Sequence, residues 1–113
     1  MFKFEVLPNG PDNESVWLWG VDGRQVILGA VSREAIQDDA QPPQTNLSHE
    51  QRVLVASANV ADIAALLQRK IAAGEAFRPH PEARPRVEIR SGELRRAGVT
   101  LRTDVLAMPF KWR

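Results

Sequence analysis

Hydrophobic and polar residues in the first third of the chain follow a pattern that predicts a β-hairpin. Residues 15–20 and 25–31 are both rich in β-branched and aromatic side chains, which favour extended strands. Between them, Asp22 and Gly23 form a pair that is common in two-residue hairpin turns, because both central positions of a type I′ turn need a positive φ. The two runs are therefore expected to pair as antiparallel strands.

The register of this hairpin separates two sets of hydrophobic side chains. Counting outward from the turn gives the pairs Val21 with Arg24, Trp19 with Val26, and Trp17 with Leu28. Side chains alternate across a strand, so one face is expected to carry Trp17, Trp19, Val26 and Leu28. The opposite face is expected to carry Val16, Leu18 and Ile27. Because both faces are apolar, each should be covered, one by a helix and the other by a short helix and the C-terminal tail or by another molecule.

The face with the two tryptophans is the candidate interaction face. Large aromatic side chains are enriched at the centres of protein interfaces. A homodimer or a complex with another protein is the partner arrangement that this face predicts. The alternative is that Trp17 and Trp19 belong to the internal core.

One long helix is expected over residues 49–73. Ser48 and Gln51 match a capping box, in which each side chain bonds the backbone amide of the other residue. Apolar residues recur at three- and four-residue steps and form a stripe of Val53, Ala56, Val60, Ile63, Leu67 and Ile71. Gly74 follows the last turn, where glycine often ends a helix. Ser57 and Asn59 are weak helix formers, which leaves a bend or a split open.

Shorter segments complete the pattern. Residues 2–7 alternate as a half-buried strand does, and Ser32 is placed to cap a short helix over residues 33–39. Residues 78–85 alternate proline with other residues and are expected to be extended. Residues 91–98 fit a capped helical turn.

Together these elements predict a single α+β domain over residues 1–103. A small antiparallel sheet, built on the hairpin, would pack against the long helix, and residues 86–90 would add a later strand. Residues 99–103 fit either a last strand or the start of a tail, and residues 104–113 are expected to form a basic, aromatic tail. A chain of 113 residues suits one hydrophobic core.

The order of these segments resembles a family of small bacterial proteins described only as a domain of unknown function. The resemblance covers roughly residues 15–90. It is carried by the hairpin, by Val31-Ser32-Arg33-Glu34-Ala35-Ile36 and by Asn59-Val60-Ala61-Asp62-Ile63-Ala64. It implies a bacterial protein and brings no activity, cofactor or site residue with it.

Charge is distributed unevenly along the chain. The formal net charge is +1, but residues 84–113 carry a net charge of +5 and residues 1–83 carry −4. The basic residues of the last third form a candidate basic patch of Arg84, Arg86, Arg90, Arg95, Arg96, Arg102, Lys111 and Arg113. These residues either neutralise the acidic part within the fold or bind an acidic partner or a phosphate backbone. Nucleic-acid binding, with Phe110 and Trp112 stacking on bases, is therefore the alternative function.

Catalysis is poorly supported by the residue content. Cysteine is absent, which excludes a thiolate metal site and a cysteine nucleophile. His49 and His80 have no partners at metal-ligand spacing, and Asp38 and Asp39 would point in different directions on a helix. We expect no catalytic residue, metal or cofactor.

These observations favour a non-enzymatic protein-interaction or oligomeric accessory module. No apolar run approaches the roughly 18 residues needed to span a membrane, and the N-terminal residues lack the core of a signal peptide. The absence of cysteine fits a reducing compartment, so the expected location is the cytoplasm.

Overall fold

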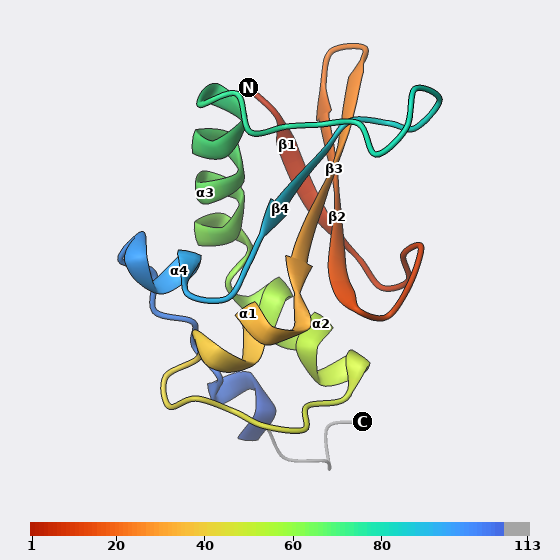
Figure 1. Ribbon diagram of the computed structural model, residues 1–113. Helices are drawn as coiled ribbons and strands as arrows, with labels where there is room; N and C mark the ends of the chain where they lie inside the picture. The colour runs from red at the N-terminus through yellow and green to blue at the C-terminus, as the bar shows by residue number, and fades with distance from the viewer. Residues whose placement is uncertain (108–113) are drawn as a thin grey trace.

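The computed structural model describes residues 1–107 as a four-stranded sheet with helices packed against it (Figure 1). The strands are β1 (Lys3–Leu7), β2 (Ser15–Asp22), β3 (Gln25–Ser32) and β4 (Arg86–Ile89). The helices are α1 (Arg33–Asp38), α2 (His49–Ala58), α3 (Val60–Ala72), α4 (Glu93–Arg96) and the 3-10 turn η1 (Asp104–Ala107). The predicted α+β class is confirmed.

The sheet is mixed, which differs from the expected antiparallel sheet in its last strand. The strand order is β1-β2-β3-β4, and the β1–β2 and β2–β3 pairs are antiparallel. β4 runs parallel to β3. A parallel pair needs a crossover connection, and the chain supplies one through α1, α2 and α3.

β2 and β3 form the predicted hairpin with a different turn. The two loop residues are Gly23 and Arg24 instead of Asp22 and Gly23. Gly23 has a φ of +60°, and Arg24 is not in the positive-φ region, which matches a type II′ turn with glycine at its first central position. The pairs on the tryptophan face are therefore Val21 with Val26, Trp19 with Leu28 and Trp17 with Ala30. Because the shift is two residues and side chains alternate with a period of two, the predicted faces are unchanged.

The predicted long helix is divided into α2 and α3 at Asn59. The Asn59 side-chain amide donates to the Val55 carbonyl at 2.8 Å and to the Arg102 carbonyl at 2.9 Å. Its Oδ1 accepts from the Arg102 amide at 2.9 Å. Asn59 is buried, so these bonds satisfy groups that water does not reach. The corner between the two helices is thereby fixed to the segment near the end of the described chain.

The predicted caps at Ser32 and Ser48 and the glycine after α3 are confirmed, whereas α4 (Glu93–Arg96) begins without a side-chain cap. Both hydrogen bonds of the capping box between Ser48 and Gln51 are present at the start of α2. Ser32 caps α1 by accepting from the Ala35 amide at 3.0 Å. Gly74 follows α3 with a φ of +79°, a conformation that glycine adopts without strain.

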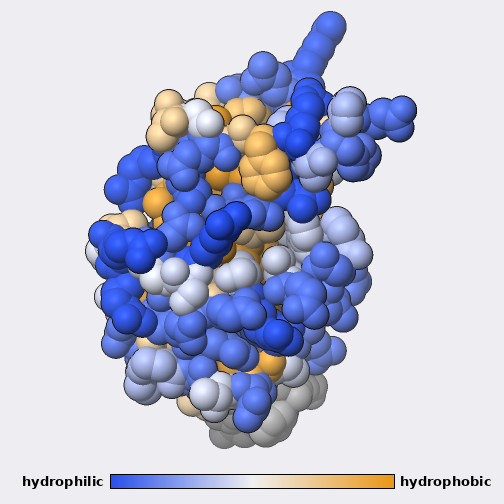
Figure 2. All heavy atoms as spheres, in the orientation of Figure 1, coloured by the Kyte–Doolittle hydropathy of each residue, from blue (hydrophilic) through white to orange (hydrophobic). Residues whose placement is uncertain are grey.

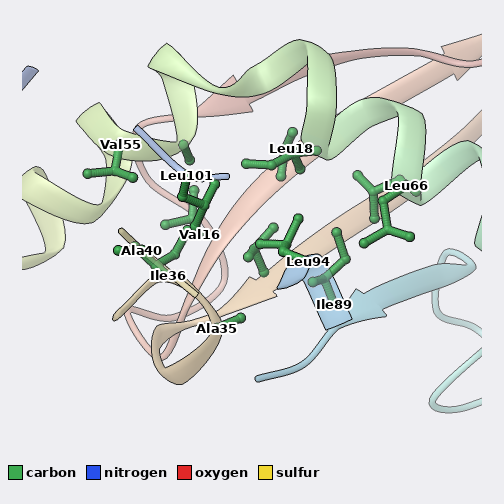
Figure 3. Packing of buried hydrophobic residues seen from close by; sticks show 14 of the residues in the cluster. Val16, Leu18, Ala35, Ile36, Ala40, Val55, Leu66, Ile89, Leu94 and Leu101 are labelled. Carbon is green, nitrogen blue, oxygen red and sulfur yellow. The ribbon is translucent and has the colours of Figure 1, made fainter. Parts of the chain in front are cut away.

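The core lies between the helices and the inner face of the sheet (Figure 3). Ile63 and Leu67 of the predicted stripe are fully buried. Gly29 of β3 allows α3 to approach closely, because a Cβ at this position would lie 2.8 Å from Leu67 Cδ1. The largest fully buried hydrophobic side chains are Val16, Leu18, Val31, Ile36, Val55, Ile63, Leu67, Val87, Ile89, Leu94 and Leu101.

The segment after α4 packs against the end of the core. Leu101 is fully buried and forms an isolated parallel bridge with Ala40. Val105 and Leu106 of η1, at the start of the predicted tail, also pack against the core cluster. The remaining residues of the predicted tail, 108–113, lie outside the described residues.

The expectation of an extended segment at residues 78–85 is wrong, because this segment forms a closed loop. Phe77 and Arg86 exchange two backbone hydrogen bonds, at 2.8 and 2.7 Å, which bring the ends of the loop together. Within the loop, the Ala83 amide donates to the His80 carbonyl at 3.0 Å. Long-range pairing at the ends of the loop therefore overrides the local preference of the prolines for a straight, extended chain.

The surface is mixed in character. In the view of Figure 2 it is mostly hydrophilic, and hydrophobic residues occupy small separate areas. Hydrophobic side chains scattered in this way are normal on a protein surface. Within residues 1–107, no helix combines the length and the apolar character needed to cross a membrane.

Leu67→Ala should lower the free energy of unfolding by about 2–5 kcal/mol, because it leaves a cavity at a fully buried position. Gly29→Ala should also destabilise, since its new methyl group would crowd the Leu67 side chain. The double variant should lose less than the sum of the two single losses, because the smaller side chain makes room for that methyl group. Urea denaturation of the four proteins measures the coupling, and additive losses would contradict the contact. Leu54→Ala, at an exposed position of α2, is the control and should cost less than about 1 kcal/mol.

Candidate interaction surface

The face of the sheet opposite the core carries the predicted interaction residues. The residues on it are Lys3, Glu5, Leu7, Trp17, Trp19, Val21, Val26, Leu28, Ala30, Arg86 and Glu88. None of them belongs to the core cluster between the sheet and the helices. Figure 1 shows α3 on one side of the strands, and the loops at residues 8–14 and 78–85 on the other. We call this surface the outer face.

Trp17 is enclosed by the chain itself and is only 3% exposed. A Cβ at Gly10 would lie 2.2 Å from Trp17 Cδ1, so the loop between β1 and β2 packs directly on the indole. The indole Nε1 donates to Asp12 Oδ1 at 3.4 Å, and the guanidinium carbon of Arg86 lies 4.9 Å from the ring centroid. Trp17 therefore anchors this loop to the sheet and is not an exposed contact residue.

Trp19, Val26 and Leu28 are half-buried on the outer face. The guanidinium carbon of Arg84 lies 5.0 Å from the centroid of the Trp19 ring. Each such cation–π contact contributes about 0.5–1 kcal/mol when exposed, and it also holds the guanidinium group in place. The structure thus brings the two predicted sets together, because Arg84 and Arg86 of the basic patch stack on the two tryptophans of the interaction face.

Among the other described arginines of the basic patch, Arg90 reaches this surface, since its Nη2 lies 3.4 Å from Glu88 Oε1, whereas Arg95 and Arg102 bind elsewhere. Arg95 lies 3.6 Å from the carboxylate of the buried Asp39. Arg102 Nη2 donates at 2.8 Å to the carbonyl of Ala58, at the end of α2, where backbone acceptors lack helical partners. These two arginines therefore hold parts of the fold together. Two members of the predicted patch, Lys111 and Arg113, lie outside the described residues.

Arg90 and Arg96 line a polar hollow of about 540 Å³ that borders the outer face at Glu88. At its centre, the buried Lys70 donates to the Glu93 carboxylate and lies 3.3 Å from that of Glu75. Burial raises the pKa of Glu93, but hydrogen bonds from Lys70 and from the Arg90 amide, with the charge of Lys70, outweigh it. The pKa of Glu93 is therefore held below its ordinary value of 4.5. The hollow contains basic and acidic groups in balance and does not form a one-sign patch.

The adjacent carboxylates Asp38 and Asp39 bind neighbouring residues of one turn, although the sequence predicted that they would point in different directions. Asp39 is fully buried and accepts from the Gly92 amide at 2.9 Å, so it links the end of α1 to the start of α4. Asp38 accepts from the Ser91 hydroxyl at 2.7 Å. Both carboxylates therefore fix the position of the turn before α4.

The two histidines also lie apart. His49 Nε2 is 3.1 Å from the carbonyl oxygen of Pro8, which connects the start of α2 to the loop between β1 and β2. His80 is exposed in the loop before β4. Within residues 1–107, no three His, Asp or Glu side chains are arranged to hold a metal ion.

A groove of about 660 Å³ at the hairpin tip was not indicated by any sequence pattern. It lies between the hairpin turn, the end of α3 and the loop before β4. Its lining includes Arg24, Arg78 and Arg84, together with Val26 and Ile71. These residues come from three segments that are far apart in the chain, so neither periodicity nor spacing could have grouped them.

Comparisons of the chain with protein-family models, with curated proteins and with solved structures gave no match. The resemblance of residues 15–90 to a family of small bacterial proteins therefore stays a prediction.

Trp17→Ala should lower the free energy of unfolding by about 3–5 kcal/mol, because it removes a buried aromatic ring. Trp19→Ala should cost clearly less, since the Trp19 side chain is already partly exposed. Chemical denaturation followed by far-ultraviolet circular dichroism compares the two variants with the wild type. Equal losses would show that Trp19 is as enclosed as Trp17.

Glu93→Gln should lower the free energy of unfolding by about 1–3 kcal/mol near neutral pH, because Lys70 loses a charged partner. The pKa of Glu93 is lower in the folded protein than in the unfolded chain. The stabilisation is therefore fully present above pH 4.5 and is lost as the pH falls through the folded pKa. Urea denaturation across this range should show the two proteins converging only below about pH 4.5. Glu5→Gln, at an exposed position of β1, is the matched control. A difference that did not shrink in acid would contradict the ion pair.

Proposed function

We propose that this chain is a non-enzymatic protein-interaction module that binds its partner through the outer face of the sheet. The observation that carries the proposal is the contrast between the two faces. Helices cover the inner face, whereas in the part of the chain that the structure describes only loops lie over the outer face. This leaves Trp19, Val26 and Leu28 half-buried beside one another.

The chemistry of the outer face suits contact with a protein. Aromatic and aliphatic side chains lie at its centre, with Arg84 stacked on Trp19, and the charged residues Lys3 and Glu5 lie at its margin on β1. Protein interfaces commonly combine an apolar centre with a polar rim, and tryptophan and arginine are enriched among their strongest contacts. The partner would be a second copy of the chain or another protein, and the proposed setting is the bacterial cytoplasm.

Nucleic-acid binding is the second candidate, and the contacts between arginines and tryptophans are the observation in its favour. Basic groups beside aromatic rings are typical of single-strand binding surfaces. Stacking, however, needs an open ring face. Here Arg84 and Arg86 lie over the two rings, and Trp17 is buried. We therefore favour a protein partner.

Site-directed photo-cross-linking tests the proposal. A photoreactive amino acid replaces Leu28 on the outer face, and a matched variant carries it at Leu54, an exposed hydrophobic residue of α2. We expect a cross-linked protein product from position 28, either with a second copy of purified chain or in an extract, and none from position 54. Size-exclusion chromatography with light scattering distinguishes a homodimer from another complex.

A competition experiment uses the variant Leu28→Ser without the photoreactive group. This variant should keep the circular dichroism spectrum of the wild type and should compete poorly for the product formed at position 28. Equal products at both positions would contradict the proposal. A product removed by nuclease treatment would favour the second candidate instead.

A further inference from the structure

The groove at the hairpin tip continues the outer face. Val26 belongs to both surfaces, and Arg84, which lines the groove, stacks on Trp19 of the outer face. In Figure 1 the hairpin tip and the loop before β4 meet at the end of the molecule opposite α1 and α2. The two surfaces therefore meet at Val26 and Arg84, where a partner on the outer face would reach the edge of the groove.

The groove is basic. Its lining holds the guanidinium groups of Arg24, Arg78 and Arg84, and a single carboxylate, that of Glu82. Within residues 1–107, none of the three arginines forms an ion pair. Most other basic side chains near the sheet and α4 do have acidic neighbours. An excess of positive charge without internal partners attracts an anionic ligand.

Two of the three guanidinium groups are held in position by the fold. Arg78 Nη1 donates to the Ala83 carbonyl at 2.7 Å across the closed loop. Arg84 lies over the Trp19 ring. Because these side chains are already ordered, binding would lose less conformational entropy than it would with free side chains. The loop that the Phe77–Arg86 pairing closes thus presents its arginines in a set arrangement.

The rest of the lining is largely aliphatic. Val26, Ile71 and Ala76 line it and are half-buried. An anion that fits must therefore carry apolar groups beside its charges. The three arginines are exposed, whereas a small-molecule site usually encloses most of its ligand. An extended chain lying across the surface fits this open shape better.

We propose that the groove binds an acidic segment of the partner protein, in which an aliphatic side chain lies between carboxylates. The carboxylates would pair with Arg24, Arg78 and Arg84, since guanidinium groups bind carboxylates through paired hydrogen bonds. The aliphatic side chain would contact Val26 and Ile71. This inference rests on the proposed function and adds to it the chemistry of the partner.

The test uses the full chain with isotope-labelled methyl groups and a short peptide that has glutamates on both sides of a leucine pair. Titration followed by NMR should shift the methyl signals of Val26, Ile71 and Ala76 first. The counterpart peptide with glutamine in place of glutamate should bind about tenfold more weakly, since it loses several exposed charge pairs. Shifts centred elsewhere would overturn the inference.

Arginine variants show which positive charges contribute to peptide binding. Arg24→Gln and Arg84→Gln should each weaken peptide binding by about two- to fivefold. Arg33→Gln removes the same charge at the start of α1, far from the groove, and should leave binding unchanged. An equal loss in all three variants would show unspecific attraction and would overturn the site. If a single-stranded oligothymidine bound more tightly than the peptide and shifted the same methyl signals, the inferred ligand would be a nucleic acid and the proposal of an acidic segment would be wrong.

The two proposals fail separately. If the peptide does not bind while position 28 still yields its cross-linked product, the groove inference is wrong and the outer face stands. If the peptide binds the groove while position 28 yields no product, the groove is a binding site and the proposal that the outer face binds the partner is wrong.

Discussion

The parallel pairing of β4 with β3 is the constraint on which the rest of the structure depends. To return beside β3 in the same direction, the chain must cross over the sheet, and α1, α2 and α3 make this crossing against one face. The inner face is thereby filled, and Gly29 lets α3 approach closely. The same pairing carries Arg84 and Arg86 to the opposite face, where they meet the tryptophans of β2. The parallel pairing of β4 with β3 thus accounts for both the filled core and the arginines on the candidate surface.

The sequence predicts well those features that depend on neighbouring residues. The caps at Ser32 and Ser48 and the buried stripe of α3 rest on local hydrogen bonds and on a 3.6-residue period, and all of them are present. The hairpin turn was misplaced by one residue, yet the faces were correct, because a register shift of two leaves every side chain on its own side. Asn59 shows the limit of local reasoning, since its propensity suggested a break but not the Arg102 backbone that it binds.

The candidate site was only partly predictable for the same reason. The composition of each strand identified the tryptophan face, but nothing near Trp17 in the sequence showed that Arg86 would cover it. The charge count of the last third also suggested a single patch. In the structure, Arg95 lies beside the buried Asp39 carboxylate, and Arg102 binds a backbone carbonyl at the end of α2. Which charges remain available is decided by tertiary packing.

The Phe77–Arg86 bridge has a consequence for how copies of this chain can assemble. Phe77 lies along the outer side of β4, so the backbone groups of Arg86 at that edge of the sheet are already paired. The other edge, β1, is short and carries the exposed charged residues Lys3 and Glu5. Short, charged or covered edges discourage the strand-to-strand addition by which sheets grow into fibrils. Contact through a flat face behaves differently, because two copies that bury the same face against each other leave none for a third. Pairing through the proposed outer face would therefore close at two copies, and the sheet edges give little opening for polymerisation.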